Sequence, residues 1–161
     1  MRRYRFGAIL LLLALAQFGL RPWLGDERWA PDFLLIALLV YSIRSTPGRA
    51  SFAGFLIGLL ADALNPVAFG AAALAHTVVG YLAAWGKAVF FAENVLVSAG
   101  FFFVGTVIRD LLVLLAGGFV GGSRFFYQIA FWSPLKGLTT AIVGVAVLVT
   151  FQRWLDVRIS D

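Results

Sequence analysis

Long apolar stretches, each ended by a short break that contains charged residues, proline or glycine, follow one another along the chain. A helix that spans a membrane needs about 20 consecutive, mostly apolar residues. On this scale the pattern predicts six membrane-spanning helices, followed by a polar tail. The helices lie at about residues 6–24, 31–44, 49–65, 68–87, 93–117 and 133–151, and the tail at 152–161. We therefore expect an all-α integral membrane protein whose six helices form one transmembrane domain over residues 1–161.

The first apolar stretch has a second interpretation, because basic residues before a leucine-rich run are also typical of a signal peptide. No small-x-small cleavage motif follows the run, which ends in Arg21, Pro22 and Trp23. We therefore expect this stretch to be retained as a helix. The second stretch is short, and we expect the charges at its ends, on Asp32 and Arg44, to reach toward the membrane interface.

The amino-acid composition excludes several classes of protein. Hydrophobic residues make up 61% of the 161 residues and charged residues 13%, and the mean hydropathy is +0.93. A soluble domain has about 45–50% apolar and about 25% charged residues, so this chain has too few charges to cover a soluble fold. The same apolar excess excludes disorder. The lack of cysteine excludes a disulfide framework and a cysteine-based metal or redox site.

The basic residues predict how the helices are oriented in the membrane. An even number of helices places both termini on one side. With the N-terminus in the cytoplasm, eight of the 13 lysines and arginines lie on the inner side and four on the outer side, and Arg109 lies within a helix. The inner set is Arg2, Arg3, Arg5, Arg44, Arg49, Lys87, Arg153 and Arg158, and the outer set is Arg21, Arg28, Arg124 and Lys136. This asymmetry agrees with the positive-inside rule, so the net charge of +5 requires no nucleic-acid partner.

The connection at residues 118–132 is long and rich in aromatic side chains. Aromatic residues are enriched where a membrane meets water. We interpret this connection as an aromatic belt on the outer side, in an interfacial or re-entrant segment. A surface for a partner helix or a lipid is the alternative.

Small residues recur at every fourth position of two predicted helices, so they share one face of each helix. The third helix carries Gly54 and Gly58, followed at the same spacing by Asp62. The corresponding stripe of the fourth helix consists of Ala72, His76, Gly80 and Ala84. Small residues let transmembrane helices approach closely. We expect the face formed by Gly54, Gly58 and Asp62 to be a helix-packing seam, with a partner-binding face as the alternative.

Four ionisable residues lie inside the predicted helices, where a charge is costly and usually faces the bundle interior or a cavity. At about 1.5 Å of rise per residue, Asp62, His76, Arg109 and Asp110 fall at similar depths in the outer half of the membrane. We expect them to form an intramembrane polar cluster with a structural role, in which Arg109 pairs with Asp62. Asp110 points about 100° away from Arg109 on the same helix. Its expected partner is therefore different: a helix dipole, His76, Lys136 or another protein.

Asp32 has a separate explanation, because it directly follows Pro31 at the start of the second predicted helix. A carboxylate at that position accepts hydrogen bonds from free backbone N–H groups and complements the helix dipole. We therefore expect Asp32 to be the cap of this helix.

The residues that enzymes and metal sites require are scarce. The chain has no cysteine and a single histidine, so it offers no pair of imidazoles for a metal. It also lacks a glycine-rich phosphate loop and a serine-centred nucleophile motif. We expect no catalytic residues, no metal site and no cofactor.

The first half of the chain carries a combination of motifs that resembles the rod shape-determining protein MreD family of bacterial inner-membrane proteins. Pro31-Asp32-Phe33-Leu34-Leu35 opens the second helix, and Gly54-Phe55-Leu56-Ile57-Gly58-Leu59-Leu60-Ala61-Asp62 lies in the third. A Pro66-to-Gly70 loop follows, and Gly80-Tyr81 lies in the fourth helix. The length, the six predicted helices and the cytoplasmic N-terminus match this family as well.

This resemblance implies a non-enzymatic scaffold of the cell-elongation machinery that supports sidewall peptidoglycan synthesis and cell shape. The expected partner is an MreC-like protein, which crosses the membrane once and carries a periplasmic coiled coil. The actin-like MreB, and RodA with its partner transpeptidase, are further expected partners, besides the lipid bilayer. The resemblance also implies a six-helix fold like that of the substrate-binding subunit of energy-coupling-factor transporters.

That fold similarity supplies an alternative function, a vitamin-binding subunit of such a transporter. These subunits tend to carry an Ala-x-x-x-Ala motif in the first helix, whereas Ala8, Ala14 and Ala16 lack that spacing. A membrane enzyme acting on lipid-linked precursors is a third class, for which Asp62, His76, Arg109 and Asp110 would be the candidate residues. We favour the scaffold.

Overall fold

The computed structural model describes residues 2–26, 28–64, 68–90, 95–119 and 121–155. These residues form helices and connections, with no β-strand among them. The longer helices are α1 (Arg2–Gly19), α2 (Phe33–Ile43), α3 (Pro47–Leu64), α4 (Ala71–Phe90), α5 (Val95–Ala116) and α7 (Ser133–Leu155). Shorter helical segments are a 3-10 turn (Arg21–Leu24), α6 (Gly122–Tyr127) and a π-helical turn (Gln128–Trp132). The described chain is therefore all-helical, as the sequence predicts.

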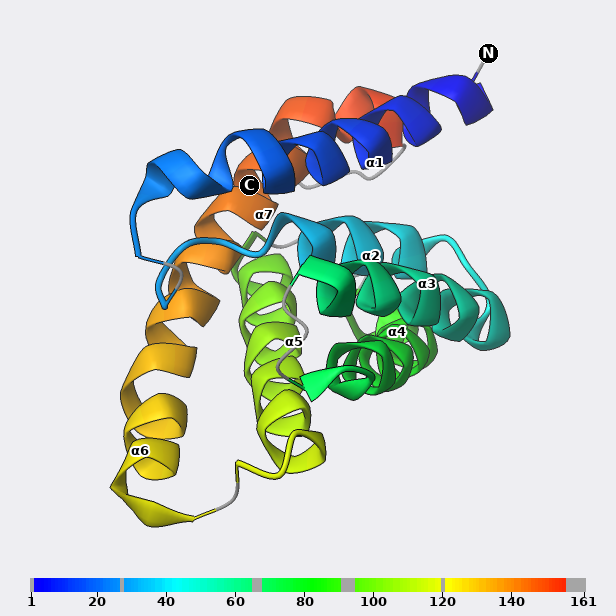
Figure 1. Cartoon of the computed structure of the whole chain (residues 1–161). Coiled ribbons are helices and arrows are strands. Elements are labelled where there is room, and N and C mark those ends of the chain that lie inside the picture. The colour runs from blue at the N-terminus through cyan, green and yellow to red at the C-terminus, as the bar shows by residue number, and fades with distance from the viewer. Residues whose placement is uncertain (1, 27, 65–67, 91–94, 120, 156–161) are drawn as a thin grey trace.

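Helix α2 lies at the centre of the molecule. Every residue from Phe33 to Val40 is buried, which suits a segment that is apolar all the way round. It contacts α1, α3, α4, α5 and α7. In Figure 1, α1 runs along one side of α2 and α3 and α4 lie on the opposite side, while α5 and α7 lie toward the end at which α2 begins. The side chain of Arg44 is exposed, but Asp32 is only 1% exposed. The expectation that Asp32 reaches toward the interface is therefore wrong, because this carboxylate is paired inside the bundle.

Helices α3 and α4 form the most extensive helix–helix contact of the described chain. Gly54 lies against the backbone carbonyl of His76, and Gly58 lies against the backbone of Ala72 and Ala73. A β-carbon at either glycine would overlap those backbone atoms. The glycine face of α3 is thus an internal packing seam, because only hydrogen in place of a side chain permits this approach.

The last helix begins at Ser133, as the sequence predicts, but other helical segments precede it directly. Helical backbone starts at Gly122 in α6 and continues through the wide turn of Gln128–Trp132 into α7. The N–H of Ser133 donates to the carbonyl of Gln128, five residues earlier. Pro134 follows directly, and proline inside a helix lacks an N–H and crowds the preceding turn. A wide turn at this point is a known way to accommodate such a break, so helical backbone leads into α7 from residues that the sequence assigned to a connection.

Most other helix boundaries differ from the expected ones by a few residues. The first helix ends at Gly19 and is followed by the separate 3-10 turn, which Gly25 closes with a φ of 93°. The fourth begins at Ala71 rather than at residue 68. The predicted ends at residues 65 and 93 lie outside the described residues, as does the tail beyond residue 155.

Large apolar side chains cover much of the outer surface. Examples on four helices are Leu11, Phe52, Trp85 and Leu96, which are between 62% and 78% exposed. Two helical stretches are long and apolar enough to cross a membrane, Val95–Ala116 and Phe125–Phe151, and shorter apolar stretches occur in α1, α2 and α4. An apolar exterior of this kind is expected of a protein surrounded by lipid.

The packing of α3 on α4 generates a first prediction. Gly54→Ala should lower the free energy of unfolding by about 1–3 kcal/mol, because the new methyl group forces the two backbones apart. Gly100→Ala in α5 is the matched control, since nothing lies within 4 Å of its β-carbon position. It should leave stability unchanged or raise it by up to about 1 kcal/mol. Reversible unfolding of the purified variants in mixed micelles measures both, and equal stability of the two would contradict the seam.

Candidate functional site: a buried polar network beside a cavity

The start of α2 gathers polar side chains from distant parts of the chain. Asp32 is the N-cap of α2, as the sequence predicts, and its carboxylate accepts a hydrogen bond of 3.0 Å from the N–H of Leu35. The N–H of Phe33 donates to the side-chain oxygen of Gln17 in α1 at 3.1 Å. The N–H of Asp32 donates to the hydroxyl of Thr140 in α7 at 3.2 Å. Free N–H groups of a buried helix start must find acceptors, and here two other helices supply them.

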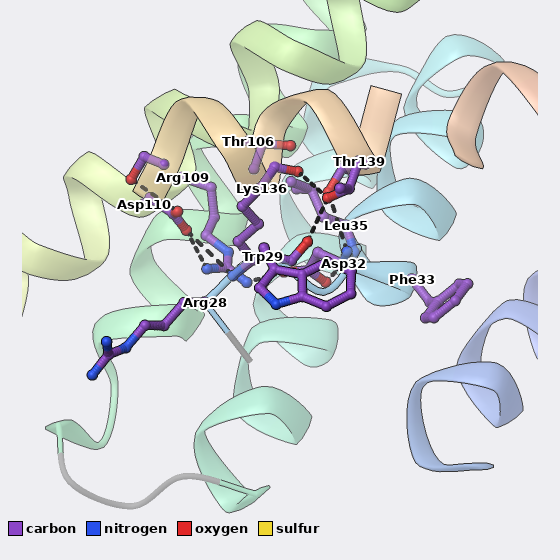
Figure 2. A network of polar contacts seen from close by, with 12 residues as sticks. Arg28, Trp29, Asp32, Phe33, Leu35, Thr106, Arg109, Asp110, Lys136 and Thr139 are labelled. Carbon is purple, nitrogen blue, oxygen red and sulfur yellow. Dashed lines mark hydrogen bonds and ion pairs between the residues drawn. The ribbon is translucent and has the colours of Figure 1, made fainter. Parts of the chain in front are cut away.

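The guanidinium group of Arg109 in α5 links this helix start to α5. It forms ion pairs with the carboxylates of Asp32 and Asp110. Figure 2 shows Arg109 pointing toward both carboxylates. The side chain of Arg109 is 13% exposed and that of Asp32 is 1% exposed. The predicted pairing of Arg109 with Asp62 is therefore wrong, and Asp110 shares its cation with Asp32 instead of facing elsewhere.

Asp110 connects α5 to α7. Its carboxylate accepts a hydrogen bond of 3.0 Å from the hydroxyl of Ser133, and the ammonium of Lys136 lies 3.7 Å away. Lys136, one of the possible partners of Asp110 that the sequence left open, thus lies beside this carboxylate. Ser133, Lys136 and Thr140 lie three and four residues apart, so they form one stripe of α7 that faces α2 and α5.

We call the connected set of side chains described above the buried polar network. Its members are Gln17, Asp32, Arg109, Asp110, Ser133, Lys136 and Thr140. They come from α1, the start of α2, α5 and α7. Four segments that are far apart in the sequence are therefore joined by hydrogen bonds and ion pairs at one level of the bundle.

Asp62 has a different role from the one that the sequence predicts. Its carboxylate accepts hydrogen bonds from the backbone N–H groups of Gly70, Ala72 and Ala73, at 3.0, 3.0 and 2.9 Å. These groups belong to the start of α4, where negative charge is favoured by the helix dipole. Asp62 therefore fixes the connection between α3 and α4 and forms the end of the glycine seam.

His76 is fully buried in α4 and does not join the buried polar network. Its Nδ1 lies 2.8 Å from the carbonyl oxygen of Ala72, one turn earlier in the same helix. Its Nε2 has no hydrogen-bond partner among the described residues. The expected cluster of Asp62, His76, Arg109 and Asp110 is thus divided, because only Arg109 and Asp110 share contacts.

A cavity of about 610 Å³ lies beside the buried polar network. Asp32, Arg109 and Lys136 form part of its wall, and Asp62 lines it as well. Further polar side chains on the wall are Gln17, Arg21, Arg28 and Gln128. The sequence did not predict this cavity, because its wall combines residues of all six longer helices with residues of the segments between them. Asp62 and Arg109 therefore face one space without contacting each other.

The chemistry available at this site is electrostatic. Among the described residues, no group of three or more histidines, cysteines or acidic residues is close enough to bind a metal ion. The carboxylates of the site accept hydrogen bonds from backbone N–H groups or form ion pairs with basic side chains. The sequence did not predict that three uncharged polar side chains, Gln17, Ser133 and Thr140, belong to this site. Gln17 carried a usable signal as the single uncharged polar residue of the first apolar stretch, whereas serine and threonine are common in apolar helices.

The ion pair between α2 and α5 generates a second prediction. Arg109→Gln combined with Asp32→Asn should show a coupling free energy of about 0.5–3 kcal/mol in a double-mutant cycle, as expected for side chains in contact. Asparagine keeps the capping ability of residue 32, so the cycle isolates the charge. Unfolding of the single and double variants in mixed micelles provides the measurement.

The matched control pairs Arg109→Gln with Asp62→Asn. No hydrogen bond or ion pair joins the described side chains of Arg109 and Asp62, so these two effects should add to within about 0.5 kcal/mol. Strong coupling to Asp62 and none to Asp32 would contradict the observed network.

Comparison with known proteins identifies the family. A sequence model of the family described as rod shape-determining protein MreD matches residues 3–156, which is nearly the whole chain. No curated protein matches the chain, and no solved structure matches it. The chain therefore belongs to the MreD family of rod shape-determining membrane proteins.

Proposed function

We propose that this protein is a non-enzymatic scaffold of the bacterial cell-elongation machinery, embedded in the inner membrane by six spanning helices. In this role it binds an MreC-like protein that crosses the membrane once, and so supports sidewall peptidoglycan synthesis. MreB, and RodA with its transpeptidase partner, belong to the same proposed assembly. The family match over residues 3–156 carries this proposal.

Two features of the structure support a scaffold. The internal polar groups are used to join helices, and the seam between α3 and α4 fixes two more helices against each other. The outer surface is rich in large apolar side chains, which suits contact with lipid and with apolar helices of other proteins. A stable body with an apolar exterior is what a membrane scaffold requires.

The structure also restricts where a partner helix can bind. The face of α3 that carries Gly54, Gly58 and Asp62 is covered by α4, so a partner cannot use it without separating these two helices. The exposed face of α3 carries Phe52, Phe55, Leu56 and Leu60. We therefore place partner contacts on outward faces such as this one, and withdraw the glycine face as a partner-binding surface.

Co-purification tests the proposed function. The tagged chain, extracted from native membranes in mild detergent, should retain an MreC-like protein that mass spectrometry identifies. Arg109→Leu is the control variant, since the loss of one partner of a buried ion pair costs about 3–5 kcal/mol. If capture requires the folded chain, this variant should retain less of the MreC-like protein. Recovery of paired ATPases with a coupling membrane subunit would contradict the scaffold and indicate a vitamin transporter instead.

The proposed orientation generates a separate prediction, which the absence of native cysteine makes simple to test. Thr46 and Ser123 are both exposed, before α3 and in α6. In intact spheroplasts, a membrane-impermeant maleimide should label Ser123→Cys and leave Thr46→Cys unlabelled until the membrane is permeabilised. Labelling of Thr46→Cys alone would reverse the orientation, and labelling of both would contradict the proposed number of spans.

A further inference from the structure

The cavity beside the buried polar network has an excess of positive charge on its wall. Four basic side chains line it, namely Arg21, Arg28, Arg109 and Lys136, together with two carboxylates, Asp32 and Asp62. The charged groups share the space with the amides of Gln17 and Gln128. Arginine side chains present a planar fork of N–H donors that matches the oxygens of a carboxylate or a phosphate.

The two carboxylates are already engaged. Asp62 accepts three backbone N–H groups at the start of α4. Asp32 caps α2 and pairs with Arg109. Neither carboxylate contacts Arg21. Asp110, next to the cavity, pairs with Arg109 and lies 3.7 Å from Lys136. The positive charge of the wall that has no carboxylate partner among the described residues is therefore that of Arg21.

Arg21 is the basic side chain of the wall that forms no ion pair with a described carboxylate. Its Nε is buried and has no hydrogen-bond acceptor among the described residues, and the same is true of the Nε of Arg109. The side chain of Arg28 is 61% exposed, and its Nε lies 4.0 Å from a carboxylate oxygen of Asp26, which makes a long ion pair. A buried donor without an acceptor is costly. The terminal nitrogens of Arg109 are bonded to Asp32 and Asp110, so Arg21 is the arginine of the wall whose guanidinium group is available to an anionic group.

We propose that the cavity binds a phosphate group, held between Arg21 and Arg109, with Lys136 and Arg28 contributing further positive charge. This inference goes beyond the scaffold function and does not depend on it. The anion balances the positive charge of Arg21, which no described carboxylate pairs with, while Arg109 and Lys136 keep their ion pairs with Asp32 and Asp110.

The surroundings of the cavity favour a phosphate carried by a membrane lipid. Phe119, Val113 and Leu34 line the cavity beside its charged groups, so an acyl or glycerol portion has apolar side chains to contact. Trp23 and Trp29, close in sequence to Arg21 and Arg28, are 89% and 38% exposed. Tryptophan is enriched at the level of lipid headgroups, which is where a phosphodiester of an anionic lipid lies.

Lipid binding to the full chain in a non-ionic detergent tests this proposal. Native mass spectrometry measures the bound fraction during titration with phosphatidylglycerol, with a diacylglycerol of the same acyl chains, and with inorganic phosphate. We expect one phosphatidylglycerol to bind at much lower concentration than the diacylglycerol. Arg21→Gln should weaken this binding about tenfold or more, as expected for the loss of a charge-assisted hydrogen bond, and Arg21→Lys should restore part of it.

Two further variants keep the result interpretable. Arg28→Gln changes an exposed connecting residue and should also weaken binding, so it replaces Arg21→Gln if that variant fails to fold. Arg49→Gln removes an exposed charge near the start of α3, away from the cavity, and should bind phosphatidylglycerol like the wild type. Equal losses in Arg49→Gln and Arg21→Gln would overturn the proposal, because they would indicate non-specific attraction to the surface.

The remaining outcomes are also decisive. Binding of diacylglycerol as tight as that of phosphatidylglycerol, or unchanged binding in both Arg21→Gln and Arg28→Gln, would overturn the phosphate site. Displacement of phosphatidylglycerol by inorganic phosphate at similar concentration would support the site and assign it to a soluble phosphate. The absence of such displacement would assign it to the lipid headgroup.

Discussion

The positive charge of Arg109 lies inside an apolar helix bundle, where an unpaired ion is very costly. The pairing of Arg109 with Asp32 and Asp110 is therefore the constraint on which the arrangement of the other helices depends. Asp32 begins α2, so the ion pair sets the position of the central helix relative to α5. Ser133 and Lys136 contact Asp110, which adds α7 to the same group of contacts.

The second structural unit, α3 with α4, uses a different kind of contact. Glycine against backbone brings these helices together, and Asp62 satisfies the N–H groups at the start of α4. The two arrangements meet at α2, which contacts helices of both groups. The ion pairs determine how α2, α5 and α7 lie next to one another, and the glycine contacts let α3 and α4 pack closely. The six longer helices thus form one body around an almost completely buried central helix.

This combination explains how the described chain keeps polar groups in the interior of an apolar helix bundle. Each carboxylate of the site already has a structural role, as a cap or as a partner of a cation. The same arrangement leaves a cavity whose wall includes arginine donors that the described residues do not satisfy. A structural core and a ligand-binding space are thus formed by the same side chains.

Much of the fold is predictable from apolar runs, small-residue spacing and the cap at Asp32. The glycine seam follows from a spacing of four residues, because that spacing places Gly54 and Gly58 on one helix face. The partner of Arg109 could not be predicted in the same way. Estimated depth placed Asp62 and Arg109 at one level, but depth does not say which helices are neighbours.

Asp32 was assigned to the cap of α2 and to the membrane interface but not to an ion pair, although a carboxylate has enough oxygen lone pairs to accept from a backbone N–H and an arginine together. The helical backbone of residues 122–132, directly before the last helix, was missed for a different reason. A proline after a polar residue is typical of a helix start, and a wide turn that lets a helix continue through Pro134 has no clear sequence signal. The cavity could not be predicted either, since its wall combines residues from Gln17 to Lys136.

Solid-state NMR of the chain in lipid bilayers tests the central claim most directly. With isotope labels on the arginine guanidinium nitrogens and the aspartate carboxyl carbons, the dipolar coupling between them reports which groups are in contact. Our account predicts a strong coupling of Arg109 to a second carboxyl group besides that of Asp110, and this coupling is lost in Asp32→Asn and kept in Asp62→Asn. Loss of this coupling in Asp62→Asn, with no change in Asp32→Asn, would contradict the arrangement of helices described above.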